Sequence, residues 1–235
     1  MKSAGAKPDS ALLSSRLRRH CLACVPALVL GGLLPSMASA SARDDFFHAV
    51  RFDDVRGLRS LLAQGVDPNL AEPSRGESGL IVALREKSMK VFAVLLDTQD
   101  IDVNAQARNG DTALMIASYL GNEPAAEALL ARGAQVNRPG WTALHYAAAS
   151  GSDGIVQLLL KNSAYINAES PNKTTPIMMA AYMGHIQTVK LLLDAGADAT
   201  LKNELGLTAI DIAQKSGHRD IAEGLTYRLR KEGKL

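Results

Sequence analysis

The chain of 235 residues carries 26 Lys and Arg against 24 Asp and Glu, and this formal charge of +2 gives no reason to expect a nucleic-acid partner. Hydrophobic residues make up 47% of the sequence, which is typical of a folding chain and excludes a disordered one. Two cysteines exclude a disulfide-rich scaffold and a four-cysteine metal site, and an aromatic content of 4% argues against a large aromatic-lined cofactor cavity.

Residues 1–40 have the order of a secretory signal peptide. Five basic residues precede or flank the start of an uncharged, mostly apolar run of 13 residues, and Ala38-Ser39-Ala40 supplies the small residues that a signal peptidase reads. The run is shorter than the ~20 residues that span a bilayer, which favours a leader over the alternative, a disordered start before a membrane anchor. Both cysteines lie in this segment, so the remaining 195 residues suit an oxidising compartment. We expect export to a bacterial periplasm, with secretion as the lesser alternative, and no stable membrane insertion after cleavage.

The rest of the chain repeats. A pair of leucines, or a pair like it, recurs at intervals of 34, 34, 30, 33 and 33 residues, with an apolar residue three positions before each pair. An asparagine closes four of the units. The pairs are Leu61-Leu62, Leu95-Leu96, Leu129-Leu130, Leu159-Leu160, Leu192-Leu193 and Leu225-Thr226, and the asparagines are Asn69, Asn104, Asn137 and Asn167.

Each unit is predicted to contain two short antiparallel helices followed by an extended turn. A threonine begins the first helix as its N-cap, and a glycine about nine residues later ends it. Helices of this length are too short to be stable alone, so the leucine pairs and alanine faces must be buried between neighbouring units. The threonines are Thr112, Thr142, Thr175 and Thr208, and the glycines are Gly121, Gly151, Gly184 and Gly217.

The pattern Gly-x-Thr-Pro/Ala-Leu-His-x-Ala-Ala, then Gly, then Val-x-x-Leu-Leu-x-x-Gly-Ala-x-x-Asn, resembles the ankyrin repeat family over residues 45–228. Residues 140–148 match most closely. The resemblance implies an all-α solenoid of about six stacked helix-turn-helix units with short β-hairpin-like fingers. We expect an N-terminal capping unit at 41–70, central repeats at 71–203, a C-terminal capping repeat at 204–228 and a solvated basic tail at 229–235.

The sequence departs from this pattern at three places. The turn at residues 137–140 is three residues shorter than its equivalents, which predicts one truncated finger. Lys173 replaces a turn glycine, and Lys87 replaces a mid-unit glycine. The first unit lacks the Thr-Pro-Leu-His segment, as a capping unit can.

No pattern indicates catalysis, a metal or a cofactor. The resemblance places His145 at a position that makes a structural hydrogen bond to a neighbouring turn, and His185 and His218 follow mid-unit glycines. Ser150, with His145 and Asp153, could be imagined as a hydrolase triad, but no Gly-x-Ser-x-Gly elbow surrounds the serine. The Met178-Met179 pair is expected in the core rather than in a copper site. We therefore expect a protein that is not an enzyme.

The remaining candidate is a binding surface. The resemblance implies a concave face formed by the finger turns and by the residues after each Ala-Ala pair. An aromatic centre over three successive units, with charged units at either side, has the composition of a protein-binding hot spot. The alternative is that Tyr182 and Trp141 simply cover the seams between repeats. The predicted partner-binding residues are Arg85, Glu86, Tyr119, Leu120, Trp141, Tyr182, Met183 and Lys215.

These observations predict a monomeric, non-catalytic interaction or adaptor protein of the periplasm, whose partner is another protein. Two alternatives stay open: an inhibitor or immunity partner of an exported enzyme, and a secreted effector directed at a host protein.

Overall fold

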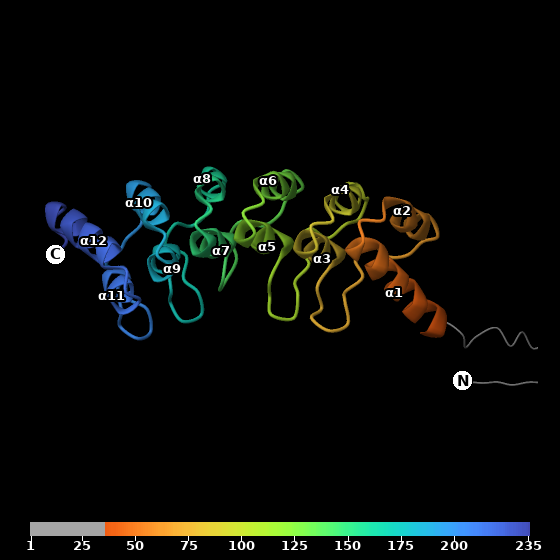
Figure 1. Cartoon of the computed structure of the whole chain (residues 1–235), viewed down its shortest axis with the longest axis horizontal. Helices are drawn as coiled ribbons and strands as arrows, with labels where there is room; N and C mark the ends of the chain where they lie inside the picture. Colours follow the sequence, from red (N-terminus) through yellow and green to blue (C-terminus); the bar gives the residue numbers. More distant parts are fainter. Residues whose placement is uncertain (1–35) are drawn as a thin grey trace, which may run out of the picture. The chain divides into compact units, whose positions relative to one another are not determined.

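The computed structural model describes residues 36–235, so most of the predicted leader lies outside the described part of the chain. Within residues 36–235 the secondary structure is helical, with no strand (Figure 1). The helices are α1 (Ser36–Arg51), α2 (Val55–Ala63), α3 (Gly79–Arg85), α4 (Met89–Asp97), α5 (Ala113–Tyr119), α6 (Glu123–Ala131), α7 (Ala143–Ser150), α8 (Asp153–Lys161), α9 (Pro176–Met183), α10 (Ile186–Asp194), α11 (Ala209–Lys215) and α12 (Arg219–Lys231).

Consecutive helices pack as six pairs, which confirms the predicted units. The first helices of the pairs, α3, α5, α7, α9 and α11, pack on one another in an inner row, and the second helices form an outer row (Figure 1). Small residues allow the inner row to pack closely, because Ala147, Ala148, Ala180 and Ala181 are fully buried. Leu95, Leu129 and Leu159, the first members of three leucine pairs, are also fully buried, as expected of helices that are stable only when stacked.

All four predicted threonines stand at N-cap positions, although the buried Thr175 hydroxyl at the start of α9 has no hydrogen-bond partner among the described residues. Thr112 and Thr208 are N-caps whose hydroxyls accept hydrogen bonds from the amides of Met115 and Asp211, and Pro176 is the first residue of α9. Inner helices α7 and α9 end at glycines in the left-handed region, as predicted. The same backbone persists where glycine is replaced, because Lys87 has φ = 60° and Lys173 has φ = 58°.

The repeated asparagines join each unit to the next. The side-chain Nδ2 of Asn69 donates to the backbone carbonyl of Asp100 at 2.8 Å, and the side-chain Oδ1 of Asn69 accepts from the backbone amide of Asp102 at 2.8 Å. Asn137 repeats both bonds two units later, to the carbonyl of Ser163 and from the amide of Tyr165. These bonds satisfy backbone groups of the extended turns that no helix can pair.

The fingers are turns rather than β-hairpins. Among residues 36–235 the β-type pairing is limited to one isolated bridge between Ala71 and Ser78. The finger before α5 is closed by the Ala107 amide, which donates to the Asp111 carbonyl at 2.9 Å. The loop before α7 is the truncated one predicted from the sequence (Figure 1), and Arg138 extends from it to donate to the Gln106 side chain at 3.0 Å.

Two predicted boundaries fall inside helices. Helix α1 begins before residue 41 and so crosses the expected end of the leader. Helix α12 continues to Lys231, three residues past the expected end of the last repeat, because Leu229 packs into the core one turn after Leu225. The basic end of the chain is therefore partly a helical element of the capping unit. No helix among residues 36–235 is long and apolar enough to cross a membrane.

Candidate functional site

Two adjoining cavities open along the inner row of helices. The first, here called the α7 cavity, has a volume of about 230 Å³, and the second, the α9 cavity, has a volume of about 320 Å³. Trp141 and Met179 line both cavities, and together we call them the aromatic groove. The α7 cavity is lined by Tyr119, Trp141, His145, Tyr146, Ala149, Met179 and Met183. The α9 cavity is lined by Trp141, Asn172, Thr174, Met178, Met179, Tyr182, Asn203, Leu205, Leu207, Ile212, Lys215 and Ser216.

The repeat positions the two exposed tyrosines of the groove. Tyr119 and Tyr182 are the last or next-to-last residues of α5 and α9, at the same position of their units, and their side chains are 53% and 55% exposed. Leu120 and Met183 follow them directly and are also exposed. Met183 lines the α7 cavity, whereas Leu120 lies beside the groove without lining either cavity.

Trp141 forms the wall between the two cavities. It directly precedes Thr142, the N-cap of α7, and its ring lies edge-on to the His145 ring with centroids 5.2 Å apart. Trp141 is partly buried against the core, which agrees with the alternative that it covers a seam between repeats. Tyr182 is more than half exposed and is therefore not explained by that interpretation.

His145 lies at the base of the α7 cavity as an uncharged group. Its Nδ1 lies 2.9 Å from the Thr142 hydroxyl, and its Nε2 lies 2.9 Å from the carbonyl oxygen of Thr174 in the next finger, which confirms the predicted structural hydrogen bond. Burial lowers the pKa of His145 to about 4, because desolvation penalises the imidazolium more than the hydrogen bonds to carbonyls favour it. The ring is thus neutral near pH 7.

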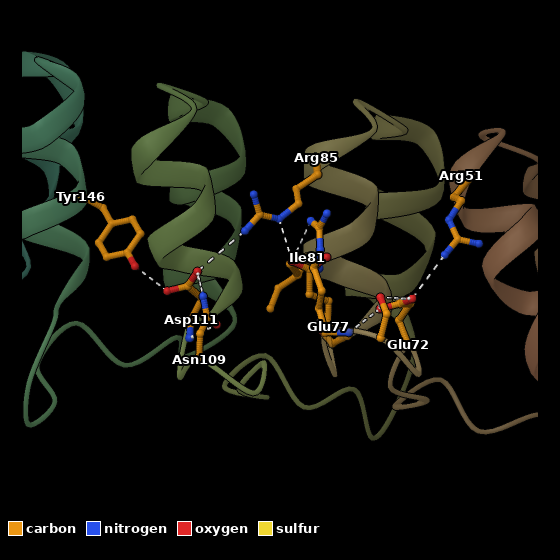
Figure 2. Close-up of polar contacts among 11 residues, drawn as sticks. Arg51, Glu72, Glu77, Ile81, Arg85, Asn109, Asp111 and Tyr146 are labelled. Atoms are coloured by element: carbon orange, nitrogen blue, oxygen red, sulfur yellow. Dashed lines mark hydrogen bonds and ion pairs between the residues drawn. The ribbon is translucent and has the colours of Figure 1, made fainter.

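A chain of polar contacts continues from the α7 cavity toward the N-terminal units (Figure 2). The Tyr146 hydroxyl donates to Asp111 at 2.5 Å, and Arg85 contacts Asp111 at 3.7 Å and Glu77 at 2.9 Å. Burial, followed by the hydrogen bond to Asp111, raises the pKa of Tyr146 above its usual value. The guanidinium of Arg85 is therefore engaged by two buried carboxylates, and neither Arg85 nor the exposed Glu86 lines the groove.

The sequence interpretation missed Tyr146, Asp111 and Glu77. A signal was available, because Glu77 and Asp111 each stand one residue before the N-cap of an inner helix, 34 residues apart. The equivalent residue in the next unit is Trp141. The residue before the N-cap is thus a carboxylate in two successive units and an aromatic residue in the third, and this aromatic residue, Trp141, lines the groove.

The side chains of the imagined triad have other partners. The Ser150 hydroxyl lies 3.1 Å from the Ser118 carbonyl oxygen, and Asp153 accepts from the hydroxyl of Thr188 at 2.6 Å. Both ring nitrogens of His145 are engaged as described above. Met178 is fully buried, as expected of a core residue. Within the described residues, no three His, Cys, Asp or Glu side chains converge as a metal site would require.

Comparison with known proteins identifies the repeat. A family described as "Ankyrin repeats (3 copies)" matches residues 46–139, 99–170 and 144–232. The chain is 32% identical over 160 residues to human transient receptor potential cation channel subfamily A member 1, and 32% identical over 190 residues to protein glp-1 of Caenorhabditis elegans. It is 31% identical over 179 residues to human SH3 and multiple ankyrin repeat domains protein 2. These matches cover 63%, 74% and 74% of this chain but only 14%, 15% and 10% of the relatives.

Proposed function

The chain belongs to the ankyrin repeat family, and we propose that it is a non-catalytic adaptor that binds another protein through the aromatic groove in a bacterial periplasm. Ankyrin repeats generally mediate protein–protein interaction and are typically not catalytic. The relatives are much longer than the matched region, so their activities are not transferred to this chain.

The observation that carries the proposal is the composition of the groove. Tyr119, Trp141, Tyr146 and Tyr182 gather there with Met179 and Met183, in a chain whose aromatic content is only 4%. Aromatic side chains supply large contact areas at a low entropic cost, and methionines adapt to irregular partner surfaces. A partner side chain that entered either cavity would exchange water for contact with aromatic rings and methionines, which is the kind of contact that hot-spot residues make.

The location rests on the sequence. Residues 1–40 have the order of a signal peptide, and residues 41–235 contain no cysteine that could mispair in an oxidising compartment. Fusion of residues 1–40 to a reporter that is active only in the periplasm tests this part. Reporter activity that depends on the segment supports export, and equal activity without it refutes export.

The binding surface is tested by affinity purification with the tagged full chain. The double variant Tyr119→Ala/Tyr182→Ala should lose the partner that the wild type recovers, because each truncated ring is a wall of a cavity. The matched control is Tyr165→Ala/Tyr227→Ala, since these tyrosines are more exposed than the first pair but line neither cavity. Equal recovery by the two double variants would refute the groove as the binding site.

A further inference from the structure

The aromatic groove contains a single charged side chain. Lys215, the last residue of α11, lines the α9 cavity and is exposed, and the other residues that line the two cavities are neutral near pH 7, His145 included. No carboxylate of the described residues lies within ion-pair distance of the Lys215 ammonium. The groove therefore presents one free positive charge beside a surface of aromatic, apolar and uncharged polar side chains.

The nearest acidic residue on the same helix is already occupied. Asp211 lies one turn before Lys215, and its Oδ2 accepts hydrogen bonds from the amide and the hydroxyl of Thr208 at 2.8 and 2.7 Å. These bonds hold the pKa of Asp211 below its usual value, with smaller contributions from Lys215 and Lys202. The carboxylate caps α11 and leaves the ammonium of Lys215 open to a partner.

The opposite side of the groove lacks such a free charge. Arg85 is held between Glu77 and Asp111, and Asp111 in turn accepts from the hydroxyl of Tyr146 (Figure 2). An acidic group of a partner is therefore attracted to Lys215 at the α11 side of the groove, whereas Arg85 at the α3 side is already paired. This asymmetry also gives the partner a direction along the groove.

The two cavities are spaced to receive one short segment. They open over successive inner helices, α7 and α9, and packed helices lie about 8–10 Å apart. A polyproline II-like segment rises about 3.1 Å per residue, so its residues i and i+3 lie on one side about 9 Å apart. One extended segment can thus place an apolar side chain in each cavity.

Building on the proposed function, we propose that the partner presents an extended segment in which apolar side chains fill the two cavities and an Asp or Glu pairs with Lys215. The apolar side chains supply most of the affinity, and the ion pair fixes the direction and the register of the segment. Because the pair lies at the rim of a cavity, its contribution is modest and depends on salt.

The test uses a phage-displayed library of random dodecapeptides, selected on the immobilised full chain at low ionic strength. Selected peptides should be enriched in Asp or Glu next to apolar residues. Replacing that acidic residue by its amide should weaken binding to the wild type about twofold to fivefold, and should have no effect on binding to Lys215→Gln. Lys190→Gln, on the outer helix α10, is the matched control and should keep the full acidic preference.

Each contrary outcome has a distinct meaning. Groove-dependent peptides with a neutral or basic composition would overturn the acidic segment and leave the groove as the binding site. Acidic preference that persists in Lys215→Gln would overturn the role of this lysine. Peptides whose binding survives Tyr119→Ala/Tyr182→Ala would contradict the proposed function itself, together with the inference that rests on it.

Discussion

The neutral, buried histidine of α7 makes the stability of the repeat stack depend on pH. His145 is 1% exposed and joins the N-cap of α7 to the finger of the next unit through Thr142 and Thr174. Its pKa in the folded chain is about 4, against an ordinary value of 6.5. Because the folded value is the lower one, the unfolded chain binds the proton more readily, and folding loses stability as the pH falls below 6.5.

The size of this loss follows from the two pKa values. A shift of one pKa unit corresponds to about 1.36 kcal/mol, so the contribution of His145 to the free energy of unfolding should fall by about 2.5 kcal/mol between about pH 7.5 and about pH 4.5. The loss stops once the pH is below the folded pKa, because both states then carry the proton. Carboxylates with lowered pKa values, such as Asp211, whose ordinary value is 3.8, add a further loss only below this range.

Urea denaturation across this pH range, followed by circular dichroism, measures the effect. His145→Gln should be destabilised by about 1–3 kcal/mol near pH 7.5, because Thr142 and Thr174 lose a buried partner. Its free energy of unfolding should also depend less on pH than that of the wild type, by about 2.5 kcal/mol over the range. His48→Gln, at an exposed histidine of α1, is the control and should keep the wild-type slope. Equal slopes for the wild type and His145→Gln would refute the reasoning.

Three further substitutions test the repeat by the free energy of unfolding. Lys87→Gly should stabilise the chain by about 0.5–1 kcal/mol, since glycine adopts φ = 60° without strain. The control Lys90→Gly, inside α4, should destabilise it by about 1 kcal/mol. A decrease in the free energy of unfolding for Lys87→Gly would contradict the left-handed backbone at residue 87. Asn104→Ala should cost about 1–3 kcal/mol because it removes hydrogen bonds to the next unit, and an unchanged urea midpoint would argue against the asparagine bonds as couplers. Tyr146→Phe should cost about 1–2 kcal/mol because Asp111 loses a donor, and a neutral effect would show that Arg85 and the Asn109 side chain suffice to satisfy it.

The sequence was sufficient to predict the structural features that recur from unit to unit. Thr112 and Thr208 begin helices and His145 bonds to the next finger, because each of these roles is carried by a residue type at a fixed position of the unit. The asparagines were predicted only to close the units, and their bonds to the next unit are a finding of the structure. Residue 87 also shows that the position fixes the backbone, since a lysine keeps the left-handed conformation that the pattern assigns to glycine. These features depend on interactions within one unit or between adjacent units, so a periodic sequence pattern is enough to predict them.

The contacts specific to this chain were not predictable in the same way. That Arg85 would be engaged by Glu77 and Asp111 depends on which long side chains meet across units, and the repeat pattern does not encode such pairings. The aromatic groove was predicted in part, since Tyr119, Trp141, Tyr182, Met183 and Lys215 line it, whereas Arg85, Glu86 and Leu120 lie outside both cavities. The partner-binding role of all these residues stays a prediction.

The extension of the last helix beyond residue 228 has a signal in the sequence. Leu229 follows Leu225 by one helical turn on the buried face of α12, so the apolar period continued beyond the expected end of the repeat. The basic residues around Leu229 obscured this signal, because a run of charges at a chain end resembles a solvated tail.

Site-specific photo-crosslinking in the producing cell tests the groove most directly. A photoreactive residue at position 119 or 182 should give one discrete adduct with a partner protein, because both positions open into the cavities. The same residue at position 165 or 227, where the native tyrosines are more exposed but line neither cavity, should give none. Adducts at positions 165 and 227 with none at 119 and 182 would contradict the account.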